Sequence, residues 1–362
     1  MTGARYDAGE LTAFVAAIFR AAGMPEQDAE IVARSLVDAD THGVATHGTA
    51  RVAAYVTQLR AGEVNAAPAE RVVRDQPAAA LVDADGGFGA PAGIRAMDRA
   101  IAKARAYGVG LVGVRNVAHF GTAAFYSRHA AANGCVGLAM TSTSAVVAPY
   151  GGAEPRIGNS PLSAAAPGPD GDPEIVLDIA QSTTARGRLK LALDAGTEIP
   201  EGWAIDAAGR PTTDPAAALE GSLLTSGGHK GSGLSVVVEM LAAGLTGAQL
   251  SQDAHHGGFT RRDAGTADAS ADVTVGNLYL AVPADVFGDG EGVRNRARAI
   301  ADHVRACPPA AGFDWVRAPG DLEREHATDA ATHGVPILAP TERELHDLAT
   351  QYGLAMPHPR AG

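Results

Sequence analysis

Residues 108–121 read Gly-Val-Gly-Leu-Val-Gly-Val-Arg-Asn-Val-Ala-His-Phe-Gly, and this stretch decides the fold class. It contains the spacing Gly-x-Gly-x-x-Gly at 108–113, which in Rossmann proteins follows a strand and begins a helix. Here the order is reversed, because a helical pattern ends at Gly108 and the apolar, β-like run 109–114 follows it. No acidic residue stands about twenty positions further on to bind a ribose. We therefore expect these glycines to end a helix and to allow close packing of a strand.

The same stretch places His119 between this expected strand and the Ala-rich, helix-like run 121–133. Residues 114–153 contain neither Asp nor Glu. A histidine at a helix N-terminus feels the positive end of the helix dipole, which favours the neutral imidazole. Neutral imidazole accepts a proton near pH 7, as a general base must. A lone histidine is more often a capping or core residue, so this interpretation depends on the rest of the chain.

The composition is that of a globular protein of 362 residues, 46% hydrophobic and 19% charged. A net charge of -12 argues against nucleic acid or an anionic membrane as a partner, because phosphate binding requires a basic surface. The two cysteines, Cys135 and Cys307, are expected to be reduced thiols. No apolar signal core and no stretch long enough to span a bilayer are present, so we expect a cytoplasmic protein.

Apolar spacing predicts helices near both ends of the chain and alternating strands and helices between them. Asp7 precedes the first helix with capping-box spacing to Glu10. Ser182 is expected to cap a helix, and Thr341 is expected to begin the last one. A helix at 230–245 is apolar nearly all round, so it should be buried. The sequence thus predicts a mixed α/β core with helical segments at both termini.

A glycine-rich segment, Ser-Gly-Gly-His-Lys-Gly-Ser-Gly at 226–233, precedes that apolar helix. A lysine at a helix N-terminus opposes the helix dipole, which makes sense if an anion completes the site at Lys230. The glycines allow backbone N–H groups to approach a phosphate closely. The alternative is a flexible loop with an exposed lysine.

Three further side chains suit the chemistry of a small anionic substrate. His47 and Arg51 are four residues apart and would share one face of a helix, where an arginine fork can clamp a carboxylate. Asp178 ends the apolar run 175–180, so its carboxylate must be hydrogen-bonded or functional. The alternatives are surface charge with a capping histidine, and an aspartate that caps the next helix. A metal site made of His42, His47, His119 and Asp178 is also conceivable.

Taken in order, these motifs resemble the malate/L-lactate dehydrogenase family of the non-Rossmann type. This family also contains ureidoglycolate, sulfolactate and diketogulonate dehydrogenases and the cyclic-imine reductases. The resemblance extends from about Leu11 to Leu354 and rests on DTHGVATHGTAR (40–51), NVAHFG (116–121), APYGG (148–152), IGNSP (157–161), LDIAQSTTARGR (177–188), IPEGWAIDAAGRPTTDP (199–215) and GGHKGSGL (227–234).

The resemblance implies hydride transfer between NAD(P)H and a small 2-oxo acid or 2-hydroxy acid. It implies that His119 is the catalytic acid/base, that His47 and Arg51 bind the substrate carboxylate, and that Asp178 helps to fix the nicotinamide or the polar network around it. The nucleotide contacts that it implies are Thr143, Asp178, Ile179, Ala180 and Lys230, and with less certainty the strand residues Gly276, Asn277 and Leu278. It also implies a homodimer with the active site near the subunit interface.

The expected architecture is therefore a mixed-sheet, non-Rossmann nucleotide-binding core with helical N- and C-terminal segments. We expect a helical segment at 1–75 that packs with the C-terminal helices of 290–362. The mixed α/β core should occupy 76–289, with 120–250 as the cofactor-binding part. NAD is favoured over NADP, because Arg261 and Arg262, which could meet a 2′-phosphate, lie in an acidic, glycine-rich loop and are better explained as solvated surface.

The sequence departs from the family pattern beside the histidine, where Val117 and Ala118 replace more polar residues and should make the pocket wall less polar. Thr46 stands where serine is usual and Arg188 where lysine is common. The alternatives that remain are an NAD(P)H-dependent cyclic-imine or N-alkyl amino acid reductase, a metal-dependent hydrolase or lyase, and a catalytically silent relative. The main interpretation requires no metal.

Overall fold

The computed structural model describes residues 3–253 and 275–360, and its centre is a seven-stranded sheet. The strand order is β2 (Arg71–Asp75), β3 (Ala79–Gly87), β4 (Gly110–Val117), β11 (Val275–Pro283), β5 (Cys135–Thr141), β6 (Leu162–Pro167) and β7 (Pro173–Ile179). Within this sheet β3 and β4 run parallel, and every other neighbouring pair is antiparallel. The sheet is therefore mixed, as predicted. It differs from a Rossmann sheet, which is mostly parallel.

The glycines of the Gly-x-Gly-x-x-Gly spacing at 108–113 end a helix and allow close packing of a strand, as predicted. Gly108 ends helix α4 (Gly89–Tyr107) with φ +85°. On β4, a Cβ at Gly110 would lie 1.8 Å from the carbonyl oxygen of Ala100, so only glycine allows helix and strand to approach this closely. These residues therefore pack α4 onto the sheet and hold no phosphate.

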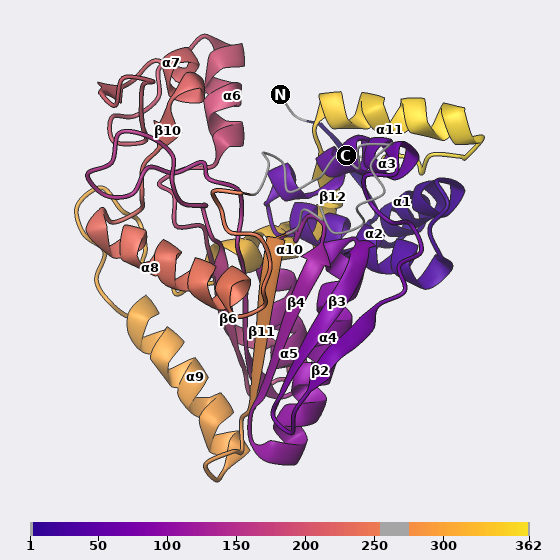
Figure 1. Ribbon diagram of the computed structural model, residues 1–362, viewed down its shortest axis with the longest axis vertical. Coiled ribbons are helices and arrows are strands. Elements are labelled where there is room, and N and C mark those ends of the chain that lie inside the picture. Colours follow the sequence, from indigo (N-terminus) through magenta and orange to yellow (C-terminus); the bar gives the residue numbers. More distant parts are fainter. Residues whose placement is uncertain (1–2, 254–274, 361–362) are drawn as a thin grey trace.

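The N-terminal helices cover one end of the sheet together with the end of the chain (Figure 1). They are α1 (Ala8–Ala21), α2 (Glu26–Thr41) and α3 (Val52–Ala61), and they contact α10 (Asp321–His333) and α11 (Ala339–Tyr352). Strand β1 (Ala4–Tyr6) pairs with β12 (Val335–Ile337). The carboxylate of Asp7 accepts from the backbone N–H groups of Gly9 and Glu10, which confirms the predicted cap of α1.

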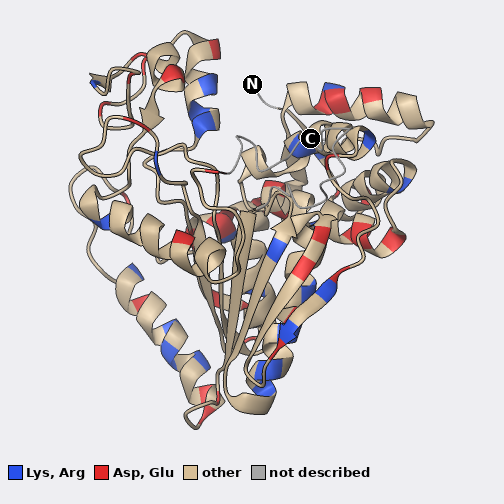
Figure 2. Cartoon of the chain, in the orientation of Figure 1, with Lys and Arg blue, Asp and Glu red and all other residues tan. Residues whose placement is uncertain are grey.

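Three features of the organisation differ from the expected ones: the packing partner of one helix, the sheet to which one strand belongs and the start of the last helix. Helix α9 (Gly290–Arg305) packs against β7 instead of the N-terminal helices, and β2 belongs to the main sheet although it lies within 1–75. The last helix begins at Ala339, because Pro340 fits the first helical turn, so Thr341 lies inside it. Figure 2 shows that charged residues concentrate on the helices and on the β2 edge, whereas the central strands are nearly free of them.

A smaller lobe stands at the same end of the sheet, across from the N-terminal helices (Figure 1). It consists of α6 (Arg186–Ala195), α7 (Pro215–Glu220) and a sheet of β8 (Ala204–Ile205), β9 (Pro211–Thr212) and β10 (Ser222–Leu223). Its own apolar core includes Val147, Ile157, Leu189 and Leu223. The prediction that Ser182 caps α6 is wrong, since the N-cap is Ala185 and Ser182 is instead bridged to Thr225.

Helix α8 (His229–Glu239) continues into a π-helical turn, η3 (Met240–Gly244). One face packs on the sheet, where Val238 and Ala242 meet Leu278. The opposite face is about half exposed at Val236, Val237 and Met240, so the prediction of a fully buried helix is wrong for this face. Apolar composition all round does not by itself specify what covers the second face. Among the described helices, none combines the length and apolar character needed to cross a bilayer.

Candidate active site

His47 and Arg51 lie on two short 3₁₀ turns between α2 and α3. Turn η1 is Ala45–His47 and turn η2 is Thr49–Arg51, so the continuous helix that the spacing suggested is broken at Gly48. The Thr46 hydroxyl lies 3.0 Å from Nδ1 of His47, and Nε of Arg51 donates to the Thr46 carbonyl oxygen at 2.7 Å. The arginine bond uses Nε, so the two terminal nitrogens can make the paired contact that a carboxylate favours.

His119 meets these residues from the loop between β4 and α5 (Ala124–Ala132). Its ring stacks on that of His47, with 5.6 Å between the centroids and 20° between the planes. The hydroxyl of Tyr55, on α3, lies 2.5 Å from Nδ1 of His119. The structure therefore brings His47, Arg51 and His119 together, and their roles as carboxylate-binding and acid/base residues stay a prediction. We call His47, Arg51, Tyr55 and His119 the substrate cluster.

The pKa values of both histidines are lowered. Burial, followed by the charges of His47 and Arg51, holds the pKa of His119 well below its ordinary value. Burial and then Arg51 lower the pKa of His47 to about 4. Both imidazoles are therefore neutral near pH 7, as expected for His119. The cause differs from the expected helix dipole, because α5 begins only at Ala124 and burial dominates.

Tyr55 was not assigned a role from the sequence. Its position four residues after Arg51 was the available signal, since residues at this spacing share a helix face. The side chain is 5% exposed, and burial raises its pKa, so the phenol stays protonated. A phenol oxygen can both donate and accept. The contact with Nδ1 can thus persist whether His119 is neutral or protonated.

Asp178 lies at the end of β7 and bonds to the segment that follows His119. Its Oδ2 accepts from the backbone N–H of Ala124 at 2.8 Å, at the start of α5. Desolvation by the surrounding protein raises the pKa of Asp178 to about 6, although the hydrogen bond from Ala124 opposes this rise. The alternative in which Asp178 caps the next helix is wrong, since the N-cap of α6 is Ala185. The carboxylate instead accepts from the first turn of α5, a helix that lies earlier in the chain. Asp178 thus joins the predicted cofactor segment to the start of α5, five residues after His119.

The other predicted nucleotide residues gather along a chain of hydrogen bonds. Thr143 Oγ1 donates to Oδ1 of Asn159 at 2.8 Å and accepts from its N–H at 3.0 Å. The N–H of Gln181 donates to the Asn159 carbonyl at 2.7 Å, and the N–H of Ser226 donates to the Gln181 carbonyl at 2.8 Å. These bonds bring Thr143, the Asp178–Ile179–Ala180 turn and the start of α8 together. We call residues 143, 159, 178–184 and 226–231 the nucleotide shelf.

Three buried side-chain atoms on this shelf have no hydrogen-bond partner among the residues that the structure describes. They are Gln181 Nε2, Ser182 Oγ and Thr184 Oγ1. Buried polar groups are nearly always paired, so these atoms suit the phosphate and ribose oxygens of a nucleotide. The sequence motif contained these residues, but it could not show that they are buried without partners. The residues present therefore fit a dinucleotide.

The start of α8 adds backbone donors and one cation. Gly227 and Gly228 both have positive φ, +65° and +61°, a conformation that side chains disfavour. A Cβ at Gly231 would lie 2.0 Å from the carbonyl oxygen of Ser226, so the turn is tight. Lys230 is exposed in the first helical turn. The anion site at Lys230 stays a prediction, because an exposed lysine also fits the alternative of a loop.

The remaining predicted cofactor residues lie in the central strand β11. Asn277 is fully buried, and its Oδ1 accepts from Thr141 Oγ1 at 2.7 Å. Leu278 packs in the core under α8, and a Cβ at Gly276 would lie 1.9 Å from the carbonyl of Ala242. These three residues thus pack within the sheet and against α8 and η3. Their direct contact with a cofactor stays a prediction.

Val117 and Ala118 do not shape the pocket wall, contrary to expectation. They are 0% and 6% exposed and belong to the main hydrophobic core. Thr46, the neighbour of His47, lies beside the start of α6. A Cβ at Gly187 would be 3.6 Å from the Thr46 methyl group. The start of α6 therefore reaches the substrate cluster from the small lobe.

The conceived four-ligand metal set is not assembled, because Nδ1 of His42 contacts the carbonyl oxygen of Asp38 at 2.7 Å instead. Within residues 3–253 and 275–360, no group of three or more His, Cys, Asp or Glu is placed to hold a metal ion.

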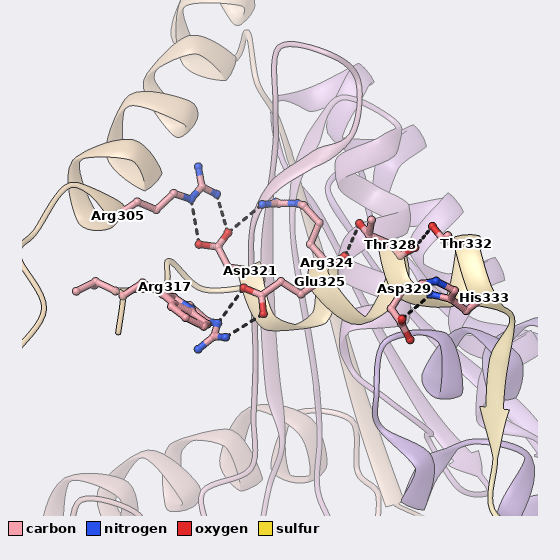
Figure 3. A pocket seen from close by; sticks show the side chains of 11 residues that line it. Arg305, Arg317, Asp321, Arg324, Glu325, Thr328, Asp329, Thr332 and His333 are labelled. Atoms are coloured by element: carbon pink, nitrogen blue, oxygen red, sulfur yellow. Dashed lines mark hydrogen bonds and ion pairs between the residues drawn. The ribbon is translucent and has the colours of Figure 1, made fainter. Parts of the chain in front are cut away.

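A cavity of about 740 Å³ lies elsewhere, between the end of α9 and α10 (Figure 3). Its arginines pair with acids of α10: Arg305 and Arg324 with Asp321, and Arg317 with Glu325. Opposite charges are thus balanced along its wall, which gives it no preference for an anion or a cation.

Comparisons with known proteins agree with this geometry. The family model described as malate/L-lactate dehydrogenase matches residues 6–346. The L-sulfolactate dehydrogenase of Methanocaldococcus jannaschii is 38% identical over 332 residues, which cover 92% of each chain. The Delta(1)-pyrroline-2-carboxylate/Delta(1)-piperideine-2-carboxylate reductase of Pseudomonas putida is 34% identical over 345 residues, which cover 95% of this chain and 96% of the relative.

The solved structures lead to the same family. Sulfolactate dehydrogenase from M. jannaschii superimposes with a TM-score of 0.87 at 34% identity, over 97% of this chain and 98% of that chain. Malate dehydrogenase from Entamoeba histolytica gives a TM-score of 0.88 at 27% identity, over 98% and 99%. Because the family model, the relatives and the fold all match over most of its length, the chain belongs to the malate/L-lactate dehydrogenase family.

Proposed function

We propose that this protein transfers a hydride between NAD(P)H and a small 2-oxo acid, giving the 2-hydroxy acid, with His119 as acid/base. The observation that carries the proposal is the substrate cluster, in which a neutral, half-buried His119 stacks on His47 next to Arg51. The nucleotide shelf is tied to the helix that follows His119 by the bond between Asp178 and Ala124. Acid/base, carboxylate clamp and nucleotide shelf are the three parts that this reaction requires.

Each residue of the cluster has a distinct task. The terminal nitrogens of Arg51 hold the substrate carboxylate, and His47 orients it. Nε2 of His119 gives a proton to the developing alkoxide in reduction and takes it from the hydroxyl in oxidation. Tyr55 holds the ring through Nδ1 in both states. The nicotinamide, when bound, supplies or accepts the hydride at C2 of the substrate.

Arg51 also links substrate binding to proton transfer. In the unliganded protein its charge is one cause of the low pKa of His119. A substrate carboxylate on the guanidinium offsets this charge, so substrate binding raises the pKa of His119. A larger fraction of His119 therefore carries the proton needed for reduction when substrate is bound.

The choice between the two nicotinamide cofactors is a finer proposal, and we favour NAD. Among the relatives, a sulfolactate dehydrogenase of Chromohalobacter salexigens is named for NADP(+), and a ureidoglycolate dehydrogenase of Escherichia coli O157:H7 for NAD(+). Arg261 and Arg262, the candidate partners of a 2′-phosphate, lie outside the described residues. A homodimer and a cytoplasmic location complete the proposal.

One assay tests the activity and the cofactor together. Oxidation of NADH and of NADPH is followed by absorbance with pyruvate, oxaloacetate, sulfopyruvate, phenylpyruvate and diketogulonate. Turnover of a 2-oxo acid with NADH supports the proposal, and a preference for NADPH contradicts the cofactor assignment. NADH binding without turnover of any acid would refute the proposed reaction.

The second candidate is a cyclic-imine or N-alkyl amino acid reductase, which the 34% identical relative from P. putida favours. Its substrate also carries a carboxylate next to the carbon that accepts the hydride, so the same cluster would serve. Adding methylamine to each 2-oxo acid and testing a cyclic imine separates the two candidates. Turnover that requires the amine or the imine identifies the reductase.

A further inference from the structure

Asp40 is a buried carboxyl group that the proposed mechanism does not use. It stands in the last turn of α2 and is 5% exposed. Its Oδ2 accepts from the backbone N–H of Thr49 at 2.7 Å and from the Thr49 hydroxyl at 2.6 Å. A Cβ at Gly48 would lie 1.8 Å from Oδ1, so the turn rests directly on this carboxyl. Burial raises the pKa of the Asp40 carboxyl to about 7, while the two bonds from Thr49 favour its charged form. Keeping an acid at such a buried position is costly, which calls for a reason.

The two bonds reach the start of the helical run that carries Arg51 and Tyr55 of the substrate cluster. Thr49 is the first residue of η2, and α3 follows at Val52. The first N–H groups of a helix lack partners, and an N-cap side chain usually accepts from them. Gly48 is the N-cap here and has no side chain to do so. Asp40 supplies the missing carboxylate from the neighbouring helix.

This anchor lies between the two carboxylate-binding residues. His47 precedes Gly48, and Arg51 follows Thr49 by two positions. A glycine allows more backbone rotation than other residues, so without the anchor η1 and η2 can turn relative to each other. Such a rotation would move Arg51 away from the Thr46 carbonyl that holds its Nε. A clamp for a small acid requires both side chains in one fixed arrangement.

We propose that Asp40, acting through Thr49, is a positioning residue that sets the carboxylate clamp formed by His47 and Arg51. The proposal rests on the proposed function, since it assumes that this clamp binds the substrate. Asp40 touches neither substrate nor cofactor in this scheme. It acts on substrate affinity through backbone geometry. The affinity of the nucleotide shelf for the cofactor should not depend on Asp40.

A matched set of threonine variants tests the proposal. Thr49→Val removes the hydroxyl bond to Asp40 at nearly constant shape, Thr49→Ser keeps it, and Thr57→Val makes the same change elsewhere on α3, where the hydroxyl bonds only to the Ala53 carbonyl. We expect Thr49→Val to raise the KM for the 2-oxo acid about tenfold, as for loss of one hydrogen bond to a charged acceptor. Thr49→Ser and Thr57→Val should stay within about twofold, a change too small to reflect a lost hydrogen bond.

Two binding measurements separate positioning from general stabilisation. The Kd of oxalate, a small dicarboxylate probe, should rise in Thr49→Val by the same factor as KM, whereas the Kd of NADH should not change. Asp40→Asn, which keeps the shape but removes the charge, should move KM and the oxalate Kd in the same direction. Circular dichroism and thermal unfolding establish that each variant is folded.

An unchanged KM and oxalate Kd in a Thr49→Val protein of lowered melting temperature would overturn the proposal, because Asp40 would then only stabilise the fold. An equal rise in the Kd of NADH would also overturn it. If the wild-type protein turns over no substrate, the proposed function fails, and oxalate binding by the same variants still decides whether Asp40 sets an anion clamp.

Discussion

The substrate cluster and the nucleotide shelf differ in how completely the protein pairs its own polar groups. In the cluster, His47, Arg51 and Tyr55 each have a partner within the chain. On the shelf, Gln181, Ser182 and Thr184 are buried, and within residues 3–253 and 275–360 each has a side-chain polar atom without a hydrogen-bond partner. The difference indicates that the substrate end is preorganised by internal bonds, whereas the cofactor end is completed by its ligand. Mutations at the first should change chemistry and KM, and mutations at the second should change cofactor affinity.

The largest effect should follow from His119→Ala. General acid–base catalysis contributes about 10²–10⁴ in rate, so kcat should fall by that factor. The Kd of NADH, measured by fluorescence titration, should stay unchanged because His119 belongs to the cluster and not to the shelf. His333→Ala, on the exposed face of α10, is the matched control and should retain wild-type kinetics. A variant at position 119 with wild-type kcat would remove the acid/base role.

Arg51→Lys should act mainly on KM. The guanidinium can bond a carboxylate with two parallel N–H groups, whereas an ammonium is a single point charge. Loss of a charged hydrogen bond should raise KM for the 2-oxo acid by roughly 10- to 100-fold. Arg60→Lys makes the same change at an exposed position of α3 and should have no effect. If KM stays constant at position 51, the carboxylate clamp lies elsewhere.

Tyr55→Phe isolates the bond to Nδ1 of His119. It removes one oxygen and keeps the ring that packs on Phe88. We expect kcat to fall about tenfold, since a hydrogen bond of about 1.4 kcal/mol orients the imidazole. Tyr107→Phe, at the exposed end of α4, controls for loss of a phenol hydroxyl. Steady-state kinetics that show a change in KM alone would assign Tyr55 to substrate binding instead.

These residues show why part of the site could be predicted from the sequence. His47 and Arg51 are close in the chain, and His119 follows a strand whose limits local patterns define. Tyr55 and His119 are 64 residues apart, and Asp178 and Ala124 are 54 apart. Their contacts depend on how α3 and β7 pack, which no local pattern encodes. Side-chain direction is also tertiary information, so Val117 and Ala118 looked like pocket residues although they face the core.

The fold follows the same division. The order of helix, glycines and strand around residue 108 excluded a Rossmann fold, and Asp7 caps α1 as its spacing predicts. The covered face of α8 and the partner of α9 were not predictable, because apolar residues signal burial without naming the neighbour. Ser182 had the residue type of a cap, but the chain takes a bridge to Thr225 before α6 begins.

The low pKa of His119 gives a pH test of the cluster. In the oxidation direction the neutral imidazole takes the proton, so activity is lost as pH falls through the pKa of His119. Burial, His47 and Arg51 lower this pKa, so the acid limb of kcat/KM should lie below pH 6.5. The limb in kcat should lie at higher pH, because the bound carboxylate offsets Arg51. Coincident limbs would show that Arg51 and the substrate do not interact.

Lys230→Ala should give the smallest effect and test the shelf alone. Lys230 is exposed, and exposed charge pairs contribute about 0.2–1 kcal/mol, so the Kd of NADH should rise by at most about fivefold. Lys190→Ala removes an equally exposed cation from α6 and should leave that Kd unchanged. If both substitutions weaken NADH equally, the contribution is a general field and not a contact at α8. If only Lys230→Ala weakens NADH binding, and kcat stays constant, the shelf binds the cofactor independently of the preorganised cluster. This result is expected because the polar groups of the cluster are paired within the chain, whereas those of the shelf await a ligand.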